Sequence, residues 1–178
     1  MKGSVILTGM PGSGKSTIGK LLAFDLNVPF YDLDKIIERE EKKIVPDIFT
    51  QKGEDYFRKI ENSVLLDFFE KNKNQKYVLA LGGGTVCFYD CINEIKKNGT
   101  LVFLNASLDQ LYQRLQFNHG SRPVLTPSYD PSFAKHLEEL FEKRKRYYLQ
   151  AHITVPSYDD KIHLLEEIRS RLDRQVTK

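Results

Sequence analysis

The stretch of sequence that decides the fold lies near the start of the chain and reads Gly9-Met10-Pro11-Gly12-Ser13-Gly14-Lys15-Ser16-Thr17. It matches the pattern G-x-x-x-x-G-K-[ST], a glycine-rich loop followed by lysine and a hydroxyl residue. A short apolar run at residues 5–7 precedes it, and a helical pattern over residues 15–26 follows it. An isolated match is sometimes only a glycine-rich turn with an accidental lysine, but here spacing and flanking elements agree. The sequence therefore predicts a nucleotide-phosphate site.

Each residue type in this loop suits a different part of a bound nucleotide. The glycines let backbone N–H groups turn toward an anion at the start of the helix. Lys15 can reach the β- and γ-phosphates, and the hydroxyl of Ser16 can ligate Mg²⁺. The predicted ATP-binding residues of the loop are Gly12, Ser13, Gly14, Lys15, Ser16 and Thr17.

Short apolar runs alternate with helical patterns along the rest of the chain. Strands are predicted at residues 30–32, 77–81, 101–104 and 153–155, and helices at about 35–42, 45–52, 54–71, 107–115 and 160–172, with others ending near residues 97 and 150. This alternation predicts an α/β fold, a parallel sheet covered by helices on both faces. Without repeats or linkers, residues 1–178 form one predicted domain, in which residues 118–131 are an exposed, mobile loop.

Composition narrows the range of functions. The chain has 178 residues, 40% of them hydrophobic, and a formal net charge of +3. That is enough apolar sequence for one core, and the small charge surplus does not by itself indicate a polyanion partner. No apolar run approaches the roughly 18 residues of a membrane span and no signal peptide is recognisable, so we expect a cytoplasmic protein. The two cysteines, Cys87 and Cys91, indicate neither a disulfide framework nor a zinc site.

Two carboxylates are candidates for the metal side of the site. The predicted strands at 77–81 and 101–104 do not end in a carboxylate, whereas Asp32 and Asp34 stand at the end of the second strand. Ligands bind at this edge of an open α/β sheet, where the phosphate loop also lies. Side chains two residues apart on an extended segment point the same way, so one can face Mg²⁺ and the other an acceptor hydroxyl. The alternative for Asp34 is a cap on the following helix.

Other candidates are arginines and glycines further along the chain. From composition alone, Arg58 is a surface partner of Glu54, four residues earlier. Three consecutive glycines, residues 82–84, stand at the carboxyl end of a strand, where we expect backbone to approach a ligand closely. Arg122, in the predicted mobile loop, can close onto phosphate oxygens or remain solvated. The basic cluster at 143–146 is mostly a charged helix face, although one arginine can turn inward to an anion.

Taken together, these residues resemble the shikimate kinase family, within the nucleoside-monophosphate-kinase-like group of P-loop proteins. The resemblance covers nearly the whole chain. Besides the phosphate loop, its segments are Phe30-Tyr31-Asp32-Leu33-Asp34 with Ile37-Glu38, Gly53-Glu54-x-x-Phe57-Arg58-x-x-Glu61, Gly82-Gly83-Gly84, Arg122-Pro123-Val124-Leu125, and Glu142-Lys143-Arg144 with Tyr148.

The resemblance implies a five-stranded parallel sheet and transfer of the ATP γ-phosphoryl group to the 3-hydroxyl of shikimate, a step toward chorismate. It also implies a substrate-binding helical segment at about 33–62 and a lid at about 117–131. We expect a monomer whose partners are ATP and shikimate, with Mg²⁺ as cofactor and with neither nucleic acid nor membrane as partner.

The implied roles fall on named residues of this chain. Catalysis is assigned to Asp34, Lys15 and Arg122, metal binding to Ser16 and, through water, to Asp32, and further ATP contacts to Arg114 and Arg122. The shikimate site is assigned to Asp34, Arg58, Gly82, Gly83, Gly84 and Arg144. Arg146 competes with Arg144, because the usual proline after this arginine is missing here.

Two other functions stay open at this point. One is a related kinase for gluconate or a nucleoside monophosphate, since two arginines can hold a phosphate as well as a carboxylate. The other is a nucleotide-dependent switch or a nucleic-acid-binding ATPase that uses the same loop and the basic helix. The paired aspartates at positions 32 and 34 weigh against the second.

Overall fold

The computed structural model describes residues 3–116 and 131–176 of the chain. Its strands are β1 (Val5–Thr8), β2 (Phe30–Asp32), β3 (Val78–Ala80), β4 (Thr100–Asn105) and β5 (Ile153–Pro156). Its helices are α1 (Lys15–Asp25), α2 (Leu33–Glu41), α3 (Val45–Asn72), α4 (Cys91–Asn98), α5 (Leu108–Gln116), α6 (Pro131–Tyr148) and α7 (Lys161–Val176), with a short 3₁₀ helix, η1 (Thr85–Cys87). The predicted lid, except for its last residue, lies outside the described residues.

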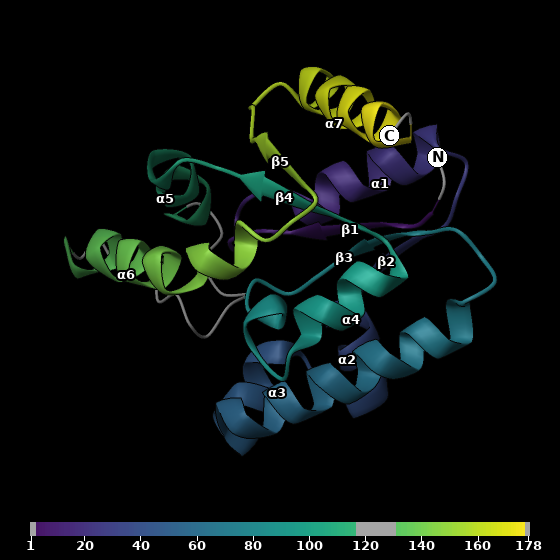
Figure 1. Cartoon of the computed structure of the whole chain (residues 1–178). Helices are drawn as coiled ribbons and strands as arrows, with labels where there is room; N and C mark the ends of the chain where they lie inside the picture. Colours follow the sequence, from purple (N-terminus) through teal and green to yellow (C-terminus); the bar gives the residue numbers. More distant parts are fainter. Residues whose placement is uncertain (1–2, 117–130, 177–178) are drawn as a thin grey trace.

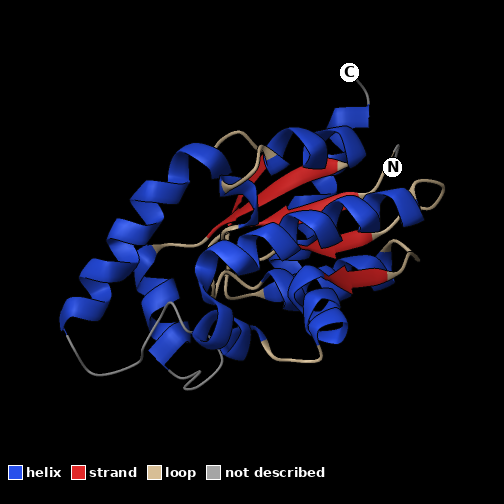
Figure 2. Ribbon diagram, turned by 90° about the horizontal axis from the view of Figure 1, so that it is seen from below, coloured by secondary structure: helices blue, strands red, loops and turns tan. Residues whose placement is uncertain are grey.

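The five strands form one parallel sheet in the order β2-β3-β1-β4-β5. Helices α1 and α7 cover one face of this sheet, and α2, α3 and α4 lie on the other (Figure 1). Figure 2 shows the strands side by side with helices around them. The predicted α/β architecture with a five-stranded parallel sheet is therefore confirmed.

Side-chain alternation along the strands divides the core into two layers. Val5 and Leu7 of β1 pack with Ile18 and Leu22 of α1, whereas Ile6 between them packs on the opposite face. Successive side chains of a strand point to opposite faces, so a strand buried on both faces reads as a continuous apolar run. This explains why the short apolar runs predicted the strands.

Local signals set the ends of several helices. Gly53, at φ 80° and ψ 171°, interrupts α3, so the predicted separate helices at 45–52 and 54–71 are present as two segments that meet at a kink. Ser107 and Gln110 form a reciprocal cap, in which each side chain accepts a hydrogen bond from the other's backbone N–H. Asp32 caps α2 by accepting a bond from the N–H of Lys35 at 3.4 Å. The cap is therefore Asp32 and not Asp34.

No helix within residues 3–116 and 131–176 combines the length and the apolar character that crossing a bilayer requires.

Candidate active site

Two adjoining cavities lie near the carboxyl ends of the strands. The first, called here the loop cavity, has a volume of about 430 Å³ and is lined by residues 12–18 together with residues 157–159, which follow β5. The second, the α2–α3 cavity, has a volume of about 670 Å³ and lies between α2, the start of α3 and the glycine turn at 82–84. Both cavities share the side chains of Ser16, Asp32 and Asp34, and the backbone of Gly83.

The phosphate loop is built by glycines in backbone conformations that other residues rarely adopt. Gly9, Gly12 and Gly14 have φ of 144°, 84° and 91°. The ammonium group of Lys15 is buried and donates hydrogen bonds to the carbonyl oxygens of Gly9, at 2.8 Å, and Met10, at 2.9 Å. These bonds hold the ammonium group of Lys15 against the phosphate loop.

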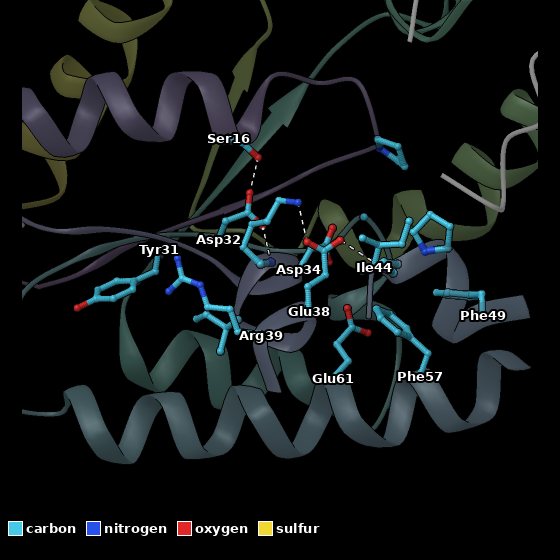
Figure 3. A pocket seen from close by; sticks show the side chains of 18 of the residues that line it. Ser16, Tyr31, Asp32, Asp34, Glu38, Arg39, Ile44, Phe49, Phe57 and Glu61 are labelled. Atoms are coloured by element: carbon cyan, nitrogen blue, oxygen red, sulfur yellow. Dashed lines mark hydrogen bonds and ion pairs between the residues drawn. The ribbon is translucent and has the colours of Figure 1, made fainter. Parts of the chain in front are cut away.

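A serine and an aspartate meet in the wall that both cavities share. The hydroxyl of Ser16 donates to Oδ2 of Asp32 at 2.6 Å, as Figure 3 shows. Asp34 is half-buried and lines both cavities. Among the described residues, no group of three or more His, Cys, Asp or Glu side chains could hold a metal ion by itself. Mg²⁺ usually keeps several waters and binds through one or two protein oxygens plus substrate phosphates, so this hydroxyl and carboxylate fit it.

Arg58 is buried, so the surface position that composition alone suggests is wrong, although its pairing with Glu54 is present. Its side chain is 5% exposed, and Nη1 donates to Oε2 of Glu61, itself only 2% exposed, at 2.7 Å. Its Nε and Nη2 donate to Oε1 of the more exposed Glu54 at 3.2 and 3.0 Å. Burial lowers the pKa of Arg58, but Glu61 and Glu54 more than offset this and raise it overall. The guanidinium therefore stays charged in its buried site.

The three glycines of the turn make room for neighbouring side chains. A Cβ on Gly82 would lie 2.9 Å from Oδ1 of Asp34, and one on Gly84 would lie 2.6 Å from Nη2 of Arg58. A Cβ on Gly83 would lie 2.7 Å from Cδ of Pro11 and 3.3 Å from Nη1 of Arg144. We predicted close approach of a ligand at this turn; the structure adds the close approach of the site's own side chains.

Arg144 and Arg146 differ sharply in their surroundings. Arg144 is buried and lines the α2–α3 cavity, whereas Arg146 is exposed and donates to the hydroxyl of the adjacent Tyr147 at 2.9 Å. One turn after Arg144, the buried Tyr148 donates its hydroxyl to the carbonyl oxygen of Gly83. Burial raises the pKa of Tyr148, so it remains a neutral donor. This geometry favours Arg144 over Arg146 as the inward-facing arginine.

Arg114 connects the phosphate loop to the segment after β5. Its Nη1 donates to the carbonyl oxygen of Gly12 at 3.2 Å, and its Nη2 pairs with Oδ1 of Asp159 at 2.6 Å. Sequence reasoning did not identify Ser157, Tyr158 or Asp159, which line the loop cavity beside it. The signal that could have found them is their place directly after a strand's carboxyl end. Arg122 lies outside the described residues.

The two cysteines near the glycine turn carry no nucleophilic chemistry at neutral pH. Burial raises the pKa of the Cys87 thiol to about 11 and that of the Cys91 thiol to about 12. Only the thiolate is a strong nucleophile, so both act as packing groups.

Comparison with known proteins agrees with this geometry. The family model described as shikimate kinase matches residues 11–173. A shikimate kinase of Sulfurihydrogenibium sp. is 39% identical over 175 residues, which cover 97% of this chain and 99% of that protein.

Solved structures extend the likeness to three dimensions. The crystal structure of shikimate kinase from Bacteroides thetaiotaomicron superimposes with a TM-score of 0.89 at 34% identity, covering 96% of this chain and 98% of that one. Shikimate kinase from Acinetobacter baumannii in complex with shikimate gives a TM-score of 0.88 at 28% identity, covering 99% and 97%. By its sequence over almost its full length and by its structure, the chain belongs to the shikimate kinase family.

Proposed function

We propose that the loop cavity holds ATP and that the α2–α3 cavity holds shikimate. As a member of its family, the chain transfers the γ-phosphoryl group of ATP to the 3-hydroxyl of shikimate, giving shikimate 3-phosphate and ADP, in aromatic amino acid biosynthesis. The observation that carries the assignment is the shared wall of Ser16, Asp32, Asp34 and Gly83. Phosphoryl transfer needs donor and acceptor oxygens close together and in line, and the common wall of the two cavities supports the assignment because it brings them next to each other.

On the donor side, the backbone N–H groups of residues 12–17 and the ammonium of Lys15 bind the ATP phosphates. The buried hydroxyl of Ser13 has no hydrogen-bond partner among the described residues and supplies a further donor in this loop. Ser16 would hold Mg²⁺ directly, and Asp32 would hold it through water. When bound, Mg²⁺ would neutralise charge on the β- and γ-phosphates. Arg114 borders the same cavity, and Arg122 is assigned to the phosphates from the lid.

On the acceptor side, Arg58 and Arg144 bind the shikimate carboxylate. A guanidinium has five N–H donors, and among the described residues Glu54 and Glu61 take three of those of Arg58. One N–H on each terminal nitrogen is left to donate to an anionic ligand. The buried Arg144, on the glycine-turn side, supplies the second positive charge.

Asp34 is the residue that meets the reacting hydroxyl. The 3-oxygen of shikimate forms a bond to the γ-phosphorus, the bond from that phosphorus to the β–γ bridging oxygen breaks, and the hydroxyl proton passes to Asp34. The position of its carboxylate in the lining of both cavities supports this role.

The test is an ADP-release assay with ATP and Mg²⁺, run with shikimate, gluconate or AMP and with no acceptor. We expect turnover with shikimate alone. Turnover with another acceptor would keep the kinase and change its substrate, whereas ADP release in every arm would indicate an ATPase. Arg58→Ala should raise the shikimate KM roughly ten- to a hundredfold and leave that of ATP nearly unchanged. Lys59→Ala, the exposed next residue, is its control. The predicted monomeric state and cytoplasmic location stay predictions.

A further inference from the structure

One contact of Arg58 comes from a residue that the proposed function does not use. Phe88 directly follows η1, and the centroid of its ring lies 4.5 Å from Cζ of Arg58. Phe57 and Phe49 lie further away, at 5.2 and 5.7 Å. All three distances are within the range in which an aromatic face attracts a cation. Phe49 and Phe57 line the α2–α3 cavity, whereas Phe88 is not among the residues that line it.

The backbone that presents Phe88 is in an unfavourable conformation. Tyr89 and Asp90, the next two residues, have φ of 51° and 56°, in the left-handed region. Aspartate tolerates this conformation, but for a bulky tyrosine it is uncommon and costs free energy. The turn is fixed by a bond from the N–H of Cys91 to the carbonyl oxygen of Phe88 at 3.0 Å, and by the amide of Asn93, which donates to Asp90. The turn that carries Phe88 is therefore strained at Tyr89 but closed by these hydrogen bonds.

Phe88 completes a short segment that supports Arg58 from several directions. At Gly84 the backbone packs so closely on the guanidinium that a Cβ would collide with it. The hydroxyl of Thr85 donates to Oε1 of Glu61 at 2.6 Å, and the other oxygen of that carboxylate accepts from Nη1 of Arg58. Residues 84–88 thus fix the arginine by close packing, through its buried counter-ion, and by an aromatic face.

We propose that Phe88 is a positioning residue for recognition of the substrate carboxylate. Its ring packs on the guanidinium of Arg58 and so fixes the orientation of this group, whose two remaining N–H groups bind the carboxylate. This inference rests on the proposed function, since it requires Arg58 to bind an anionic acceptor.

The test compares three variants in the same assay. Phe88→Leu removes the aromatic face at a position that is 37% exposed, so folding should be preserved. We expect the shikimate KM to rise about three- to tenfold, while kcat and the ATP KM stay within about twofold. Phe88→Tyr keeps the ring and should restore the wild-type KM. Phe24→Leu makes the same exchange at an 89% exposed position of α1; it is the matched control and should leave all constants unchanged.

A second substrate isolates the carboxylate. The methyl ester of shikimate lacks the anionic group, so Phe88→Leu and the wild type should phosphorylate it equally well. The inference is overturned if Phe88→Leu has a wild-type shikimate KM, if Phe24→Leu shows the same rise, or if the ester is affected as much as the acid. A wild type without shikimate-dependent ADP release would instead remove the proposed function.

Discussion

Replacement of Glu61 by glutamine tests how the buried arginine is held. Glu61 is 2% exposed and accepts hydrogen bonds from Nη1 of Arg58 and from the hydroxyl of Thr85. Glutamine keeps the size and an acceptor oxygen but removes the charge, which leaves Arg58 buried with only the exposed end of Glu54 as counter-ion.

The size of the effect follows from burial. Breaking a buried ion pair by removing one charge costs about 3–5 kcal/mol, and the retained amide oxygen places Glu61→Gln near the lower limit. For a domain of this length, each kcal/mol lowers Tm by about 2–4 °C, so we expect a decrease of about 6–12 °C. Glu54→Gln breaks an i,i+4 pair with an exposed partner, worth about 0.5 kcal/mol, and should lower Tm by no more than about 2 °C.

Thermal unfolding followed by circular dichroism measures both variants, and urea unfolding checks that each transition remains two-state. Equal decreases for the two variants would refute the reasoning, because they would mean that burial does not set the strength of the pair. A decrease below about 2 °C for Glu61→Gln would refute it as well.

Replacement of three other residues should have measurable effects. Arg144→Lys should raise the shikimate KM about tenfold because it removes a fork of donors, whereas Arg146→Lys should not; initial rates distinguish them. Lys15→Ala should lower kcat at least about a hundredfold, and near-normal turnover would contradict its phosphate role. Burial lowers the pKa of His152. As the pH falls, the unfolded state therefore takes up a proton at this position before the folded state does, and the free energy of unfolding decreases below about pH 6.5. In His152→Asn, Tm should therefore fall less as the pH is lowered. An unchanged dependence of Tm on pH would contradict this prediction.

The parts of the site that the sequence predicts are those set by local pattern. The phosphate loop needs a strand, glycines and a helix within a few residues of each other, and all of these are adjacent in the chain. Asp32 likewise stands at a strand end, and its bond to Ser16 follows from the parallel sheet that brings the two ends together.

The parts that the sequence could not predict depend on contacts between distant segments. Composition favours Arg58 as an exposed partner of Glu54, because the i,i+4 spacing is visible in the sequence while burial is not. What buries it is the turn that brings Gly84 and Phe88 onto the guanidinium. The contribution of Thr85, which acts through Glu61, was equally hidden, since the two lie 24 residues apart.

The buried charged side chains of the site favour anionic ligands in the two cavities. Among the described residues, the buried charged side chains are Lys15, Arg58, Glu61 and Arg144, and each of them lines one of the two cavities. Three are cations and one is an anion, so the buried part of the site carries a positive excess. A buried charge is unfavourable unless other charges or hydrogen bonds compensate it, and a bound anion adds to that compensation. We therefore expect phosphate groups in the loop cavity and a carboxylate in the α2–α3 cavity to offset this positive excess.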